Sequence, residues 1–206
     1  MRLPAFLLFL ALLFPLTTGA NAGWGDIDAL LGAERFAGPA GWVTLCTEQR
    51  RLCEPPSGAA RAGSGARRLG LLDAVNAGVN RAILPESEPP GADVWRLSPA
   101  RGDCDDYALT KRERLEASGW PPASLRFATL FTEEDEYHLV LLVETDRGTL
   151  VLDNRFDEPL PLDDLTRFGY RWIAVEDRDR QGWRLGRDAL AVVAAVQARV
   201  VPGGVR

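Results

Sequence analysis

The sequence has few of the residues on which several kinds of site depend. Its 206 residues include a single histidine, His138, and only three cysteines. An ordinary zinc site takes most of its ligands from clustered histidine and cysteine, and a chain with one histidine and no other His/Cys cluster cannot supply one. A serine triad would have to use the same histidine, and the Gly-x-Ser-x-Gly turn is absent. These shortages argue against a zinc or serine hydrolase.

The sequence also lacks a concentration of positive charge. Lysine and arginine number 24 against 29 acidic residues, a net charge of −5. The pairs Arg50-Arg51 and Arg67-Arg68 are isolated, as is typical of solvated surface. A nucleic-acid-binding domain needs a basic face, so we expect no nucleic-acid partner.

Only one long apolar run occurs, and it lies at the N-terminus. Arg2 precedes the apolar residues 3–16, and Ala20-Asn21-Ala22 matches an A-x-A cleavage pattern. The run is shorter than the roughly 20 residues that span a bilayer. We predict a cleaved signal peptide over residues 1–22, with an uncleaved anchor as the alternative. Residues 23–206 would then form a single periplasmic domain without a membrane segment, with a length that suits one domain.

In an oxidising compartment, the three cysteines are expected to differ in oxidation state. Cys46 and Cys53 are separated by six residues and can close a small disulfide. Cys104 would then be a lone thiol, which favours a use of its reactivity. The alternatives are a buried inert thiol, or a disulfide between Cys104 and one of the other two cysteines.

The stretch around Cys104 predicts a helix with this cysteine in its first turn. Asp103 is a suitable N-cap, and Gly119 followed by Pro121 is a suitable stop. A helix N-terminus favours the thiolate, whereas the neighbouring aspartates disfavour it. One inward face is shared by Cys104, Tyr107, Ala108, Lys111 and Leu115.

The remaining pattern predicts an α+β fold with helices first and an antiparallel sheet afterwards. A helix is expected over residues 67–84 and an amphipathic one from Ala189 to Val200. Residues 23–41 have weak patterning, and residues 57–66 are typical of a flexible loop. Strands are expected over residues 125–131, 137–144, 149–153 and 170–176, with 183–185 extending the sheet.

A hairpin can bring His138 close to Asp153. If Thr145-Asp146-Arg147-Gly148 is the turn, Val140 pairs with Asp153, and His138 lies diagonal to Asp153 at about 7–8 Å. A slip of one residue would place them on opposite faces. The simpler interpretations are a core histidine and ordinary turn chemistry at Asp153.

Cys104, His138 and Asp153 together supply the parts of a cysteine nucleophile triad. Histidine takes the thiol proton, and aspartate holds the imidazole in the productive tautomer. The N–H of Cys104 could form half of an oxyanion hole. Candidates for its second donor are Asn76, Asn80 and Trp95, although helix-surface amides and a core aromatic are simpler interpretations.

These residues resemble the bacterial transglutaminase-like cysteine proteinases. The resemblance covers residues 42–172 and is carried by Asn76-Ala-Gly-Val-Asn80, Trp95, residues 102–108, Lys111, Leu115, Gly119, residues 138–141 and residues 151–154. It implies a papain-like/transglutaminase-like fold. It also implies Cys104 as nucleophile, His138 as base and Asp153 as the orienting residue. The Cys46 and Cys53 pair looks like the N-terminal cysteines of several family members.

The resemblance also implies a cofactor and partners. Acidic residues that flank the nucleophile bind calcium in such proteases, and Asp103 and Asp105 occupy those positions here. Position 105 departs from the usual glutamate, and its shorter reach can weaken the site. Plain helix capping by these aspartates is the alternative. No organic cofactor is expected. The implied substrate is a protein, with a large surface adhesin and an inhibitory inner-membrane cyclic-di-GMP receptor as candidate partners.

Two other functions remain open from the sequence. The same triad could transfer the acyl group to an amine, as in an acyltransferase or amidase. A calcium-binding or adhesin-binding module without catalysis is a further alternative, and the co-occurrence of Cys, His and Asp argues against it.

Overall fold

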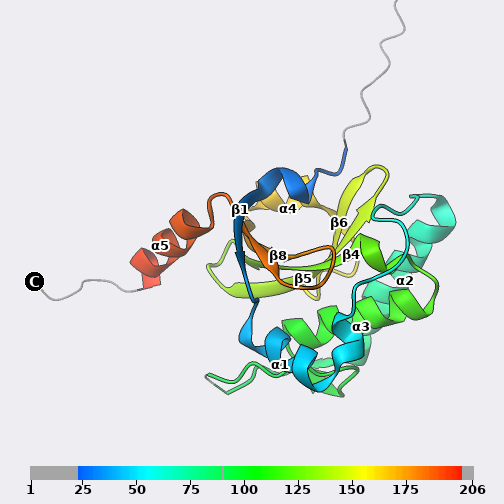
Figure 1. The fold of residues 1–206 in the computed structure, drawn as a ribbon, viewed down its shortest axis with the longest axis horizontal. Coiled ribbons are helices and arrows are strands. Elements are labelled where there is room, and N and C mark those ends of the chain that lie inside the picture. Colours follow the sequence, from blue (N-terminus) through cyan, green and yellow to red (C-terminus); the bar gives the residue numbers. More distant parts are fainter. Residues whose placement is uncertain (1–22, 90, 201–206) are drawn as a thin grey trace, which may run out of the picture.

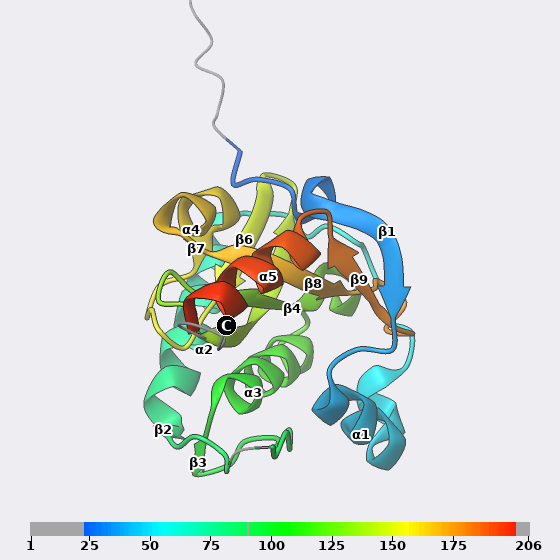
Figure 2. The ribbon, with the colours of Figure 1, turned by 90° about the vertical axis from the view of Figure 1, so that its left-hand side faces the viewer.

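A seven-stranded antiparallel sheet forms the centre of the molecule (Figures 1 and 2). The computed structural model describes residues 23–89 and 91–200, so the predicted signal peptide lies outside the described residues. The strand order is β1-β9-β8-β4-β5-β6-β7. The strands are β1 (Leu31–Phe36), β4 (Leu125–Phe131), β5 (Tyr137–Thr145), β6 (Gly148–Leu152), β7 (Leu160–Pro161), β8 (Arg171–Glu176) and β9 (Trp183–Gly186).

Helices cover both faces of this sheet. In Figure 1, α1 (Ala40–Glu48) and α3 (Cys104–Ala117) lie on one side and α4 (Leu162–Phe168) on the other. The helix α2 (Ala66–Ala82) packs against α3, and α5 (Ala189–Val200) packs along β8 (Figure 2). The shorter elements are η1 (Ile27–Leu30), η2 (Arg50–Cys53), η3 (Pro122–Ser124) and a parallel pair of β2 (Leu84–Pro85) and β3 (Arg101–Gly102). The predicted α+β class is confirmed.

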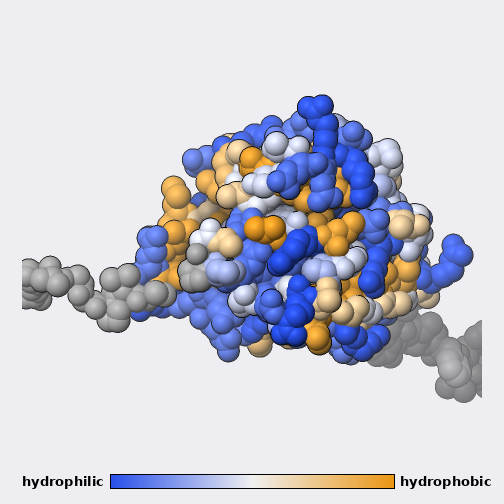
Figure 3. All heavy atoms as spheres, turned by 90° about the horizontal axis from the view of Figure 1, so that it is seen from below, coloured by the Kyte–Doolittle hydropathy of each residue, from blue (hydrophilic) through white to orange (hydrophobic). Residues whose placement is uncertain are grey.

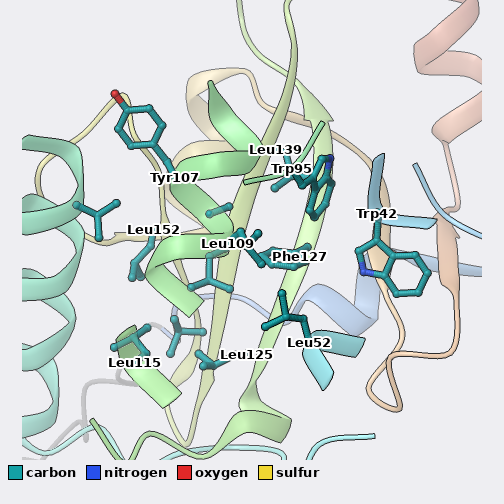
Figure 4. Close-up of a cluster of buried hydrophobic side chains, with 14 of the residues drawn as sticks. Trp42, Leu52, Trp95, Tyr107, Leu109, Leu115, Leu125, Phe127, Leu139 and Leu152 are labelled. Carbon is teal, nitrogen blue, oxygen red and sulfur yellow. The ribbon is translucent and has the colours of Figure 1, made fainter. Parts of the chain in front are cut away.

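The main core lies between α3 and the sheet (Figure 4). Leu109 and Leu115 of α3 are fully buried against Leu125 and Phe127 of β4. Trp95 meets Phe127 edge to face at 5.3 Å between ring centroids. Because α3 is held along its length by these contacts, its first turn has a fixed position relative to β4 and β5.

Both ends of α3 follow from local sequence. At the C-terminal end, Gly119 has a φ of +81°, and the N–H of Trp120 bonds to the carbonyl of Leu115. At the N-terminal end, Asp103 occupies the cap position, but its side chain makes no capping hydrogen bond. Any side chain at position 102 would collide with the Asp106 carboxylate, so glycine is required there.

Several elements differ from the sequence expectations. The weakly patterned residues 23–41 contain η1 and β1, and β1 pairs with β9 at the sheet edge. The expected flexible loop 57–66 is anchored, because Ala62 is buried and bridges to Thr145. The helices α1 and α4 were not predicted, and the strand expected to begin at residue 170 begins at Arg171.

The surface seen from below is a mosaic in which small apolar groups alternate with hydrophilic residues (Figure 3). Within the described residues, no helix has the length and apolar character needed to cross a membrane.

Candidate active site

Cys104 opens onto a cavity between the helical layer and the sheet. The cavity has a volume of about 350 Å³. Its aromatic and apolar wall includes Trp95, Tyr137 and Leu139, and its acidic wall includes Asp103 and Asp105. Cys104 is a half-buried residue, and its thiol lies beside the backbone N–H of Leu139, the residue after His138. The first turn of α3 and the first residues of β5 therefore meet at this cavity.

The β5–β6 hairpin has the predicted register. Glu144 pairs with Thr149 and Leu141 pairs with Leu152, so Asp153 follows directly opposite Val140. The structure brings His138 and Asp153 into contact, with 2.9 Å between Nε2 and Oδ1. Both side chains are buried.

This contact determines which imidazole nitrogen is free. An ionised carboxylate can only accept hydrogen bonds, so Nε2 of His138 carries the proton in the bond to Asp153. In a neutral imidazole, Nδ1 then has a lone pair and can accept a proton. Burial is the largest influence on Asp153 and opposes its charge. The hydrogen bond and charge of His138, together with the hydrogen bonds from Tyr170 and the N–H of Arg155, outweigh burial and hold the pKa of this carboxyl below its usual value.

The thiol itself lies in an environment that disfavours the thiolate. Burial, reinforced by the nearby carboxylates of Asp105, Asp103 and Asp153, raises the pKa of Cys104 to about 12. The N–H of Leu139 acts in the opposite direction. Activation of this thiol therefore needs a base, and neutralisation of the aspartates would assist it.

The aspartates at the start of α3 form a cluster that suits a cation. Ligand oxygens of Asp103, Asp105 and Asp106 lie within 4.8 Å of one another. Burial and the surrounding carboxylates raise the pKa of Asp105 to about 9. Asp106 is engaged, since it accepts hydrogen bonds from the backbone N–H of Arg96 at 2.6 Å and from its guanidinium at 3.1 Å.

The other two aspartates each retain a buried oxygen. The Oδ1 atoms of Asp103 and Asp105 are shielded from solvent and have no hydrogen-bond partner among the described residues. Hard cations such as calcium prefer carboxylate oxygens of this kind. The donor set therefore fits a calcium ion at Asp103 and Asp105, and the geometry favours these two residues over Asp106.

The family model of the bacterial transglutaminase-like cysteine proteinases matches residues 33–188. The chain belongs to this family. It is accordingly a transglutaminase-like cysteine peptidase, as the resemblance implied. A search among curated protein sequences found no match.

Solved structures of Legionella pneumophila LapG resemble this peptidase in fold. The calcium-bound form is 19% identical, with a TM-score of 0.50 over 80% of this chain and 93% of LapG. Another LapG structure is 23% identical, with a TM-score of 0.48, and an EGTA-treated form is 21% identical with the same score. Each of these two covers 78% of this chain and 86% of LapG.

The three candidates for a second oxyanion donor are engaged elsewhere in the peptidase. The amide of Asn76 donates to the carbonyls of Phe156 and Asp157. That of Asn80 donates to the carbonyls of Asp153 and Phe156. Asn76 is fully buried, so its interpretation as a helix-surface amide was wrong. The indole of Trp95 donates to Asp93 at 2.8 Å. Both asparagines belong to α2, and their side chains instead anchor the loop after β6, which contains Asp153, to this helix.

Two contacts of the peptidase site were not recognised from the sequence. Tyr170 donates to the second oxygen of Asp153 at 2.6 Å, and the backbone N–H of Arg155 donates to the first at 2.9 Å. No motif in one sequence marks these two positions, because each contact depends on tertiary packing. Lys111 lies on the inward face of α3, as the helical period predicted; it is fully buried, and its Nζ has no hydrogen-bond partner among the described residues.

The cysteines are divided between two roles in the peptidase. Cys46 and Cys53 form a disulfide with 5.4 Å between their Cα atoms, and Cys104 is free. This bond ties α1 to η2.

Proposed function

We propose that this peptidase is an exported, periplasmic endopeptidase that uses Cys104 as nucleophile, His138 as general base and Asp153 as the orienting residue. The observation that carries this proposal is the hydrogen bond between His138 Nε2 and Asp153 Oδ1. The next residue on the strand, Leu139, places its backbone N–H beside the free thiol of Cys104 at the start of α3. The A-x-A pattern at residues 20–22 supports export.

In the proposed mechanism each residue has one task. Nδ1 of His138 accepts the thiol proton while Sγ of Cys104 bonds to the scissile carbonyl carbon. The tetrahedral intermediate then expels the leaving amine, which takes that proton from Nδ1, and a thioester remains. Water, deprotonated by His138, attacks the thioester and releases the acid and the thiol. Asp153 keeps Nε2 protonated and stabilises the imidazolium formed in both steps.

The carbonyl oxygen becomes negatively charged in each tetrahedral intermediate. The backbone N–H of Cys104 lies at the start of α3, where the helix leaves its first N–H groups without helical partners. We assign this N–H as one oxyanion donor, supported by the helix dipole.

Calcium held by Asp103 and Asp105 is part of the proposal. It is supported by the two carboxylate oxygens that have no hydrogen-bond partner in the described part of the chain, and the matched LapG structure with a TM-score of 0.50 is a calcium-bound form. When bound, the ion supplies positive charge that offsets the aspartates and favours the thiolate. Asp105 and Asp103 both contribute to the high pKa of Cys104, so neutralising them acts on the nucleophile directly.

The proposed substrate is a protein segment that enters the cavity beside Cys104. Family resemblance makes a large surface adhesin the candidate substrate and an inner-membrane cyclic-di-GMP receptor the candidate inhibitor. The first is tested by incubating the peptidase with exported proteins of the organism that encodes it and sequencing the fragments. The second is tested by adding the receptor domain to that assay.

The central test compares cleavage by the wild type, Cys104→Ala and Asp153→Asn, each with calcium and with chelator. We expect no cleavage by Cys104→Ala and at least a hundredfold loss for Asp153→Asn, since the imidazole loses its orienting carboxylate. Asp157→Asn is the matched control, because this residue lies in the same loop and should retain activity. Full activity in folded Cys104→Ala would refute the proposal.

An acyltransferase would use the same thioester but another acceptor. An added primary amine distinguishes the two activities, because transfer consumes the amine whereas hydrolysis leaves it unchanged. A binding module without catalysis predicts no turnover and partner binding that Cys104→Ala does not alter.

A further inference from the structure

The carboxylate of Asp153 is held on both of its oxygens. Oδ1 accepts from His138 Nε2 and from the backbone N–H of Arg155, each at 2.9 Å. Oδ2 accepts from the Tyr170 hydroxyl at 2.6 Å. With only the Oδ1 contacts, the carboxylate could still rotate about its Cβ–Cγ bond. The hydroxyl of Tyr170 fixes that rotation.

Tyr170 is itself held by a partly buried chain of hydrogen bonds. Its side chain is 1% exposed, and Arg155 Nη1 donates to its hydroxyl oxygen at 2.9 Å. The same guanidinium is anchored by Glu133, with 2.6 Å from Nη2 to Oε1 and 2.9 Å from Nη1 to Oε2. These residues come from three separate segments: the β4–β5 turn, the loop after β6 and the residue that precedes β8.

The proton positions in this chain follow from the donor inventory. A guanidinium can only donate, so the Tyr170 oxygen must accept from Arg155. A carboxylate can only accept, so the hydroxyl proton of Tyr170 must point at Asp153. The chain Glu133–Arg155–Tyr170–Asp153–His138 therefore has one direction, and it ends at the nitrogen that fixes the imidazole tautomer.

We propose that Tyr170 is a positioning residue for the triad, which acts through Asp153 on the orientation of His138, and that the Arg155 side chain acts through Tyr170. The catalytic consequence rests on the proposed function. The effect on the imidazole does not, because it depends only on the hydrogen-bonded chain.

The first measurement uses the fact that His138 is the only histidine. In untagged protein labelled with ¹⁵N, its imidazole signals are unambiguous. We expect a single tautomer with an Nε2 proton that exchanges slowly with water. Tyr170→Phe should mix the tautomers or speed this exchange at least tenfold. Unchanged signals in folded Tyr170→Phe would overturn the inference, whether or not the protein cleaves any substrate.

Tyr107→Phe is the matched control. Tyr107 is also buried, and its hydroxyl donates to the carbonyl of Ile83 at 2.7 Å. This variant loses a comparable hydroxyl without touching the chain, so the His138 signals should keep their wild-type exchange rate. If the His138 signals changed equally in both variants, Tyr170 would have only a structural role, which would count against the inference.

The second measurement is kinetic. Tyr170→Phe should lower kcat by about 10–100-fold with little change in KM, as is typical of residues that orient a catalytic group. Arg155→Gln should lower kcat less, and the double variant should match Tyr170→Phe because both changes act through one hydroxyl. If the losses in kcat of the two single variants added up in the double variant, Arg155 would not act through Tyr170. A wild type that cleaves in a Cys104-dependent way while Tyr170→Phe keeps full kcat would refute this inference alone.

Discussion

At the scale of single residues, Lys111 is the most unusual group in the described part of the chain. It is the only lysine, it is fully buried, and its Nζ has no hydrogen-bond partner among the described residues. The ring of Tyr107 lies 6.0 Å away, and the charges of Asp153 and Asp157 attract the ammonium. Burial nevertheless prevails and lowers the pKa of Lys111 to about 7.

This lowered pKa makes stability depend on pH. Between about pH 7 and 10.5 the unfolded chain binds a proton that the folded lysine has released, so the contribution of Lys111 to stability rises with pH. Lys111→Met should remove this slope and add on the order of a few kcal/mol to the free energy of unfolding at or below pH 7. Urea unfolding from pH 6.5 to 9.5 measures both effects.

The control for this prediction is Arg81→Met, which replaces an exposed cation on α2 and should keep the wild-type slope. A slope that is the same in the wild type and Lys111→Met would show that the buried ammonium does not titrate in this window.

Part of the site could be predicted from residue type alone, because histidine and unpaired cysteine are rare in this chain. With one histidine and one unpaired cysteine, His138 and Cys104 were the only candidates for their roles, and the strand period linked Asp153 to His138. Tyr170 and Arg155 could not be found this way. Tyrosine and arginine occur at several positions, and only tertiary packing selects the ones that reach Asp153.

At the scale of elements, a buried ion pair fixes α3 to the sheet. Arg112 of α3 donates through Nη1 to both oxygens of Glu176 on β8, at 3.0 and 2.9 Å. Glu176 also accepts from the indole of Trp42 on α1 at 2.9 Å. The guanidinium lies 3.8 Å from the centroid of the Phe127 ring on β4. One carboxylate thus joins α1, α3 and β8.

Breaking this pair should cost far more than a surface pair does. Arg112→Met leaves the Glu176 charge buried without a cation, and we expect a loss of about 3–5 kcal/mol of unfolding free energy. The double variant Arg112→Met/Glu176→Gln should be less destabilised than the single, because no buried charge remains. Denaturant titration at fixed calcium concentration provides the comparison.

The exposed pair of Arg167 and Asp164 on α4 serves as reference. Its side chains are 74% and 52% exposed, so Arg167→Met should cost under about 1 kcal/mol. Similar costs at both positions would mean that water reaches Glu176 in Arg112→Met.

Elements were predicted best where a period and a stop signal agreed. The bounds of β4 matched the expected strand, and α2 matched within two residues. The failures have physical causes. β1 shows no alternation because only its first residue is buried, and α4 is a seven-residue helix too short to show a period. Both are stabilised by packing on the sheet, which local sequence does not encode.

At the scale of the whole molecule, the site lies where the helical layer meets the sheet. Cys104 and the aspartates come from α3, whereas His138 and Asp153 come from the β5–β6 hairpin. Close packing of the loop before α3 strengthens this junction: Asp93 accepts from the N–H of Gly41 on α1 at 2.6 Å. The geometry of the proposed triad therefore depends on the layers remaining docked, and a ligand at the junction should stabilise the entire fold.

Calcium binding should therefore increase the stability of the whole fold and not only that of the site. A ligand that binds only the folded chain stabilises it by about 1.4 kcal/mol for each tenfold rise in concentration above Kd. The melting temperature of the wild type should increase with the logarithm of calcium concentration, in one cooperative transition. Asp103→Asn/Asp105→Asn should show no such increase. It should also be the more stable protein in chelator, because it lacks the mutual repulsion that, together with burial, raises the pKa of Asp105 to about 9.

The reference variant for this experiment is Asp164→Asn, which also removes a carboxylate from the first turn of a helix, α4. It should follow the wild-type calcium dependence, because Asp164 is exposed and already pairs with Arg167. If Asp103→Asn/Asp105→Asn kept the wild-type slope, calcium would bind elsewhere and these aspartates would only shape the start of α3. If instead the calcium dependence is lost in this variant alone, the helix that carries the proposed nucleophile and the hairpin that carries the proposed base belong to one fold that the ion stabilises.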